Sequence, residues 1–116
     1  MPHGVPSARE LAAAVEEFLR EEAVPATSGR LSFLARVAAN VVAMLERELE
    51  LGPAYAAAHA ARLEALGVRD DAELCEAIRK GRLDDRIDEV VALARADAIE
   101  KLRIANPRWL RPEDAE

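Results

Sequence analysis

The stretch RLSFLARVAANVVAMLERELEL, residues 30–51, decides how this chain folds. Its apolar side chains recur every three or four residues, which is the period of an α-helix. They fill about half of the helix circumference, an arc that suits a central helix touching two neighbours. The members of this arc are Leu31, Leu34, Val37, Ala38, Val41, Val42, Leu45 and Leu49, with Phe33 and Met44 at one edge. The pattern predicts a buried helix in an all-α protein, although Glu48 projects into the arc.

Polar residues interrupt this helix along one line. Arg36 and Asn40 lie one turn apart, and Arg47 projects within about 40° of them at the helical period. Asparagine is a poor helix-interior residue because its amide competes for backbone hydrogen bonds. One interpretation is structural: either a network that holds helices in register or a plain solvated edge. The other is a binding surface formed by Arg30, Arg36, Asn40 and Arg47 for a phosphate or carboxylate. The first is favoured, because polar residues at the edge of an apolar arc are common.

Capping and helix-breaking residues divide the rest of the chain into further helices. Ser7 and Glu10 form a capping box that opens a first helix, which Pro25 ends. Gly52-Pro53 is expected to end the second helix and to begin a third, because proline suits the first helical position. The third helix is expected to end at Leu66, and a short fourth helix is expected between Asp70 and Gly81. A fifth helix is expected from Asp84 or Asp85 to about Ala105, with Ile87 and Val91 in its buried apolar stripe.

These segments predict one all-α domain over residues 1–116, a bundle of about five helices of which three are long and two short. The composition agrees, because aromatic residues make up only 3% of the chain and sheets favour aromatic and β-branched residues. Residues 107–116 are expected to form a tail that is disordered at its end.

The charge pattern excludes several classes of function. The formal net charge is −6 and the basic residues form no cluster, which argues against nucleic-acid binding. No run is long and apolar enough for a membrane span, and the N-terminus lacks the apolar core of a signal peptide. A single cysteine, Cys75, excludes an internal disulfide and suits a reducing compartment. We therefore expect a cytoplasmic protein that contacts neither nucleic acid nor membrane.

The residues with catalytic or metal-binding chemistry are few. His59 has no second histidine or well-spaced carboxylate on its face, so we expect a packed histidine, no metal site and no cofactor. Cys75 is expected to be a small buried side chain. Asp97 lies at the edge of the fifth helix's apolar stripe and needs a cation, for which Arg36 or Arg47 is the first choice. No convergent acid, base and nucleophile are present, which argues against an independent enzyme.

The segment after the fifth helix holds the only tryptophan. Asn106-Pro107 ends the helix, and Arg108, Trp109 and Leu110 follow. In the favoured interpretation, Trp109 and Leu110 fold back and close the end of the bundle, since a lone large aromatic is usually mostly buried. In the alternative, Arg108 and Trp109 contact a partner protein, because both residue types are enriched in interaction hot spots.

Several short motifs resemble an uncharacterised family of small helical bacterial proteins. The matching stretches are residues 10–11, 18–19, 28–33, 36–40, 47–49 and 105–109. Members of that family look like companions of aminoglycoside-phosphotransferase-like kinases, beside which or fused to which they occur, often near acyl-CoA dehydrogenases. The resemblance implies a non-catalytic accessory subunit of a hydroxyacyl-CoA kinase in acyl-CoA catabolism, and it carries no catalytic residue over.

Two further expectations concern ligands and self-association. A helical bundle that binds CoA or another phosphate-bearing ligand is the alternative function, with Arg30, Arg36, Arg47 and Arg108 around the phosphate. A homodimer is a further hypothesis, because helical bundles with an apolar face that no other helix covers often self-associate.

Overall fold

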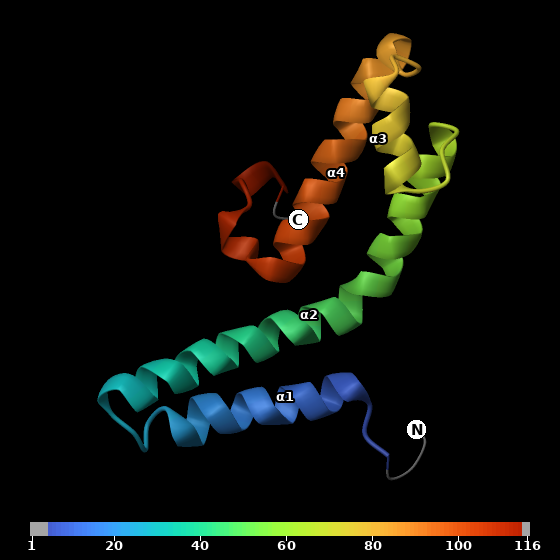
Figure 1. Cartoon of the computed structure of the whole chain (residues 1–116). Helices are drawn as coiled ribbons and strands as arrows, with labels where there is room; N and C mark the ends of the chain where they lie inside the picture. The colour runs from blue at the N-terminus through green and yellow to red at the C-terminus, as the bar shows by residue number, and fades with distance from the viewer. Residues whose placement is uncertain (1–4, 115–116) are drawn as a thin grey trace. The chain divides into compact units, whose positions relative to one another are not determined.

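The computed structural model describes residues 5–114, which form four α-helices joined by short 3₁₀ and π-helical turns (Figure 1). The α-helices are α1 (Ala8–Phe18), α2 (Gly29–Ala65), α3 (Asp71–Arg79) and α4 (Ile87–Ala105). The turns are the π-helical η1 (Leu19–Ala23) and the 3₁₀ turns η2 (Asp84–Arg86), η3 (Pro107–Trp109) and η4 (Pro112–Asp114). No strand occurs in this part of the chain, so the all-α prediction is confirmed.

The prediction of five helices is wrong, because α2 continues through the expected break at Gly52-Pro53. Among the described residues only Gly29, Gly67 and Gly81 have a positive φ, so Gly52 does not take the left-handed conformation that ends many helices. Pro53 lacks the N–H of a normal helical residue, which costs about 3 kcal/mol inside a helix. The alanine-rich sequence that follows it has high helix propensity and continues the helix to Ala65.

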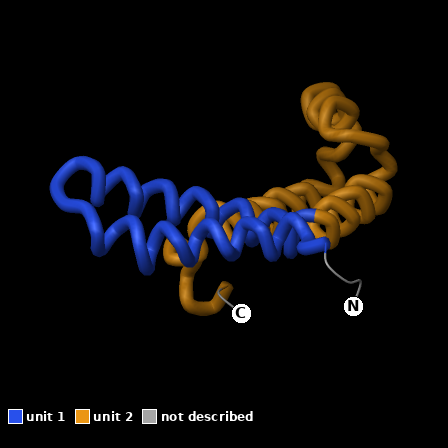
Figure 2. The backbone as a smooth tube through the Cα atoms, turned by 90° about the horizontal axis from the view of Figure 1, so that it is seen from below, with its two compact units in different colours: residues 1–52 blue, residues 53–116 orange. Residues whose placement is uncertain are grey.

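The contacts within the chain gather into two compact units, residues 1–52 and 53–116 (Figure 2). The boundary between the units lies inside α2, between Gly52 and Pro53. None of the helices in the described residues is long and apolar enough to cross a membrane.

The first unit is an antiparallel hairpin of α1 and the N-terminal part of α2, with the π-helical turn η1 at its closed end (Figures 1 and 2). Arg9 near the start of α1 forms an ion pair with Glu50, at 3.2 Å. The predicted capping box is confirmed: the Ser7 hydroxyl accepts from the Glu10 N–H at 3.1 Å, and the Glu10 carboxylate accepts from the Ser7 N–H at 2.7 Å. Both donors at the start of α1 are therefore satisfied.

Small residues form the contact between the two helices of the hairpin. Ala12 of α1 is buried, and Ala39 of α2 has no exposed surface. The large apolar side chains lie outside this contact, although the sequence predicted that most of them are buried. They are 39–61% exposed and comprise Leu11, Val15 and Phe18 of α1, and Leu31, Phe33, Leu34, Val37, Val41, Met44, Leu45 and Leu49 of α2. The difference arises because α1 covers the alanine side of α2 rather than its apolar arc.

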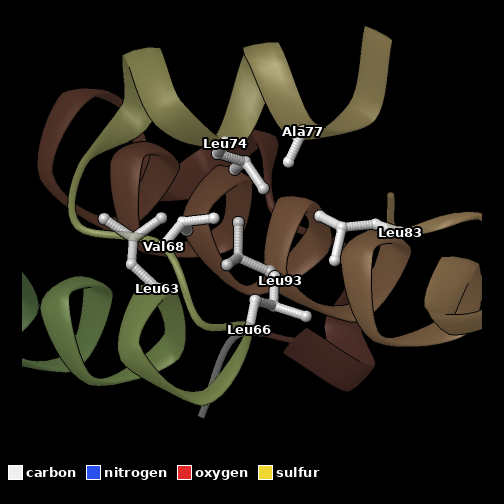
Figure 3. Close-up of a cluster of buried hydrophobic side chains, with 7 residues drawn as sticks. All are labelled: Leu63, Leu66, Val68, Leu74, Ala77, Leu83 and Leu93. Carbon is white, nitrogen blue, oxygen red and sulfur yellow. The ribbon is translucent and has the colours of Figure 1, made fainter. Parts of the chain in front are cut away.

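The second unit holds the larger buried cluster of the chain, to which α2, α3, α4 and their connections contribute (Figure 3). Its members are Leu63, Leu66, Val68, Leu74, Ala77, Leu83 and Leu93, with Val90 packed against them. The C-terminus of α2 enters this cluster through a Schellman motif, in which the N–H of Val68 donates to the carbonyl of Leu63 at 3.1 Å. Gly67 has a φ of 79° there, a conformation that glycine adopts without a Cβ penalty.

The helix α3 begins at a cap formed by Asp70, whose carboxylate accepts from the Glu73 N–H at 2.8 Å. In α4, Leu93 is the buried residue, whereas Ile87 and Val91 are 49% and 61% exposed. These two residues of the predicted apolar stripe therefore face outward, whereas Val90 packs against the buried cluster. Two carboxylates, Asp97 and Glu100, lie on the side of α4 that contacts α2, as described below.

Candidate functional site

The polar line on α2 lies beside η1, in the first unit. Arg36 and Asn40 are exposed and Arg47 is half-buried. Arg20 of η1 donates from its Nη2 to the Oδ1 of Asn40 at 3.1 Å, and from its Nε to a carboxylate oxygen of Glu16 at 2.6 Å. Asn40 thus ties α2 to the π-helical turn, which supports the interpretation of the polar line as a register device.

The four residues expected to form a ligand-binding surface do not all lie together. Arg36, Asn40 and Arg47 share one side of α2, whereas Arg30 projects roughly 80–120° away from them at the helical period. Within the described residues, neither Arg30 nor Arg36 forms a hydrogen bond or ion pair through its side chain. Arg36 is therefore the guanidinium of this side that remains available to a ligand.

A pair of carboxyl groups, Glu16 and Glu46, lies between α1 and α2 beside this line. Their shared hydrogen bond raises the pKa of Glu46, and desolvation adds to the effect. The same hydrogen bond, followed by that from Arg20, lowers the pKa of Glu16. Glu46 Oε2 is buried and has no hydrogen-bond partner among the described residues.

The most connected polar group lies in the second unit, where Arg62 of α2 binds two carboxylates of α4. Its Nη1 donates to Asp97 Oδ1 at 2.6 Å and to Glu100 Oε1 at 3.0 Å. Its Nη2 donates to Glu100 Oε2 at 2.5 Å. Hydrogen bonding to Glu100 is the main cause of the raised pKa of Arg62, so the guanidinium stays charged at every physiological pH.

His59, one turn before Arg62 on α2, completes this network. Its Nδ1 lies 2.8 Å from Asp97 Oδ2, and its Nε2 lies 2.8 Å from Asp71 Oδ1 of α3. Burial on its own would lower the pKa of His59, but the hydrogen bonds from Asp71 and Asp97 outweigh it, and the pKa is raised. Both ring nitrogens are engaged, so neither is free to take a proton from a substrate. The histidine instead links three helices.

The cation that binds Asp97 differs from the residues expected for it. The structure supplies Arg62 and His59, while Arg36 and Arg47 belong to the other unit. The sequence held a signal for this network: His59 and Arg62 are three residues apart, as are Asp97 and Glu100. Two oppositely charged pairs with the same helical spacing indicate facing sides of two helices.

One other singled-out residue lies in a different place from the one expected. Cys75, expected to be buried, is exposed on α3. Among residues 5–114, no group of three or more His, Cys, Asp or Glu side chains has an arrangement that could hold a metal ion.

The C-terminal segment is anchored but leaves its tryptophan outside. Asn106 caps η3 by accepting from the Arg108 N–H at 3.3 Å. Asp114 is bound by Arg95 at 3.0 Å, and its backbone carbonyl accepts from Arg103 at 2.9 Å. Trp109 is nevertheless 73% exposed, so it does not form the closing clasp that was the favoured interpretation. The disorder predicted for the end of the tail concerns residues 115–116, which lie outside the described residues.

Comparison with known proteins places most of the chain in one family. Residues 25–109, from the connection after η1 to the exposed Trp109, match the domain of unknown function DUF6285. No curated protein and no solved structure matches the chain. The matched region includes the polar line on α2, the network around Arg62 and the C-terminal segment. The chain belongs to the DUF6285 family.

Proposed function

We propose that the chain is a non-catalytic accessory subunit that binds a partner protein through its C-terminal segment. The observation that carries this proposal is the 73% exposure of Trp109 on a segment that capping and ion pairs hold in place. A large aromatic side chain presented on an ordered turn loses little entropy on binding, and tryptophan is the residue type most enriched in hot spots. Arg108 beside it adds a guanidinium at the rim.

The partner proposed is an aminoglycoside-phosphotransferase-like acyl-CoA kinase of acyl-CoA catabolism in the cytoplasm. This choice rests on the resemblance of the motifs at residues 28–40, 47–49 and 105–109. The engaged ring nitrogens of His59 and the permanently charged Arg62 agree with a role in which the partner supplies the chemistry.

Co-expression with a kinase of the proposed class, followed by size-exclusion chromatography and a titration of the purified proteins, tests the proposal. We expect a complex with a micromolar or lower dissociation constant. Trp109→Ala should weaken it by about 30-fold or more, the effect of losing a hot spot. Val91→Ala is the matched control, because Val91 is an exposed apolar residue of α4 and should leave binding unchanged. Separate elution at micromolar concentration, or equal binding by the Trp109 variant, would contradict the proposal.

The alternative function, binding of a CoA ester or another phosphate-bearing ligand, is supported by Arg36, whose guanidinium has no partner in the described residues. It is the weaker proposal, because Asn40 is already bound by Arg20 and Arg30 projects elsewhere. A thermal-shift screen with CoA esters tests it. A ligand at 100 times its dissociation constant should add about 2.7 kcal/mol of stability, and Arg36→Ala should remove the effect.

A further inference from the structure

The outward side of α2 in the first unit carries a regular apolar stripe. Leu34, Val37, Val41 and Met44 follow one another at spacings of three, four and three residues, the alternation of a coiled-coil seam. Each of these side chains is 39–58% exposed. Arg30 stands four residues before the stripe and Glu48 four residues after it, so both charges continue the same line.

The stripe is symmetric about Ala39. Val37 and Val41 lie two residues from this centre, Leu34 and Met44 lie five residues from it, and Arg30 and Glu48 lie nine residues from it. When the segment is laid antiparallel against a copy of itself with the centres opposite, each apolar residue meets an apolar residue. At each end, the arginine of one copy meets the glutamate of the other.

We propose that this surface binds a second copy of the chain, with the two α2 segments antiparallel across a two-fold axis. The two hairpins then form a four-helix arrangement with the α2 stripes at its centre. The charges favour this occupant: neither Arg30 nor Glu48 has a hydrogen bond or ion pair among the described residues, and the two-fold pairing provides a partner for both. It also accounts for a glutamate within an apolar arc, because Glu48 ends the seam instead of interrupting it.

The exposed apolar area suits a weak, reversible dimer. The four side chains of the stripe are 39–58% exposed, and full burial of one aliphatic side chain removes roughly 100 Å² from water. Phe33 and Leu45 flank the stripe on α2 and are 58% and 50% exposed. Together these side chains offer roughly 300 Å² per copy, and the pair buries roughly 600 Å², a size typical of weak, transient interfaces. This inference does not depend on the proposed kinase partner, whose contact is assigned to the C-terminal segment.

Sedimentation velocity of the full-length chain over a range of concentrations tests the pairing, with two glutamate substitutions as a matched pair. Val41 and Val91 are valines on α-helices with exposures of 58% and 61%. Val41→Glu should weaken the dimer by about 100-fold or more, because each copy then buries an unpaired charge against Val37 of the other. Val91→Glu should leave the dissociation constant unchanged. Circular dichroism of both variants confirms that the helices form.

The orientation is tested by charge exchange. Arg30→Glu and Glu48→Arg should each weaken the dimer by about tenfold, because two attractive contacts per dimer become repulsive. The double variant with both substitutions should restore the wild-type affinity. An equimolar mixture of the two single variants should form a heterodimer, since every end contact is again between opposite charges.

A monomer at concentrations up to about 1 mM, above the dissociation constant expected for a weak dimer, would overturn the proposal. Equal weakening by Val41→Glu and Val91→Glu would also overturn it. A parallel pairing would keep like charges together in the wild type and in each single charge variant, so unchanged affinity of Arg30→Glu and Glu48→Arg would show that the antiparallel arrangement is wrong.

Discussion

Replacement of Arg62 by alanine should destabilise the protein by about 2 kcal/mol. Arg62 donates three hydrogen bonds to Asp97 and Glu100, and hydrogen bonds to charged groups each contribute about 1.5–3 kcal/mol when well buried. The loss is smaller than the sum of three such hydrogen bonds, because the side chains of Asp97 and Glu100 are 17% and 15% exposed and water can replace part of the lost hydrogen bonding. His59 also remains beside Asp97 in the variant.

Urea denaturation followed by far-ultraviolet circular dichroism measures this change. A loss of about 2 kcal/mol should lower the midpoint by about 1 M urea at a typical slope for a small protein. Arg62→Lys should recover about half of the loss, because lysine keeps the charge but cannot bind Glu100 with two parallel hydrogen bonds. Arg69→Ala is the control: Arg69 pairs with Glu73, but its side chain is 86% exposed, so the cost should stay below about 0.5 kcal/mol. If the Arg62 and Arg69 variants were equally stable, the network would not stabilise the second unit.

Three further substitutions test separate parts of the fold. The pKa of His59 is raised above the unfolded value of about 6.5, so its charge stabilises the protein fully below that pH, and this contribution is lost as the pH rises through the folded pKa. Denaturation at several pH values should therefore show that His59→Gln loses less stability than the wild type as the pH is raised from about 6 through the folded pKa. Pro53→Ala should raise the stability by about 1–3 kcal/mol, because alanine supplies the missing helical N–H; a lower denaturation midpoint would show that proline is required there. Ser7→Ala should cost about 1 kcal/mol through the lost cap of α1, whereas no change in the midpoint would mean that the cap contributes nothing.

Local sequence signals predicted the ends of helices well. The capping box at Ser7 and the helix end expected at Leu66 depend on hydrogen bonds between residues at most five apart, and such contacts are visible in sequence. The break at Pro53 was wrong because proline at a helix start and proline inside a helix leave the same local pattern. Only the conformation of Gly52, which stays out of the left-handed region, distinguishes the two cases.

The faces of the helices were harder to predict than their ends. The sequence assigns Ile87 and Val91 to the core of α4, yet that helix turns Leu93 and Asp97 inward. Periodicity identifies an apolar face, but it does not show whether another element covers that face. In α4 the inner position of Asp97 is made favourable by Arg62, a residue 35 positions earlier in the chain. The matching spacing of His59 with Arg62 and of Asp97 with Glu100 is present in the sequence, but apolar periodicity alone does not reveal it.

The continuity of α2 has a consequence for how the chain responds to proteases and to truncation. Gly52 and Pro53 separate the two units in contacts, but both residues lie within one helix. Proteases cut extended, accessible backbone, and a helix hides its peptide bonds. Limited digestion should therefore cleave at the connections before Gly29 and after Gly67 and leave the boundary intact. A fragment that ends at Gly52 would retain backbone carbonyls whose helical N–H donors lie in the removed part of α2. We therefore expect that the chain cannot be cut at the unit boundary into two stable fragments.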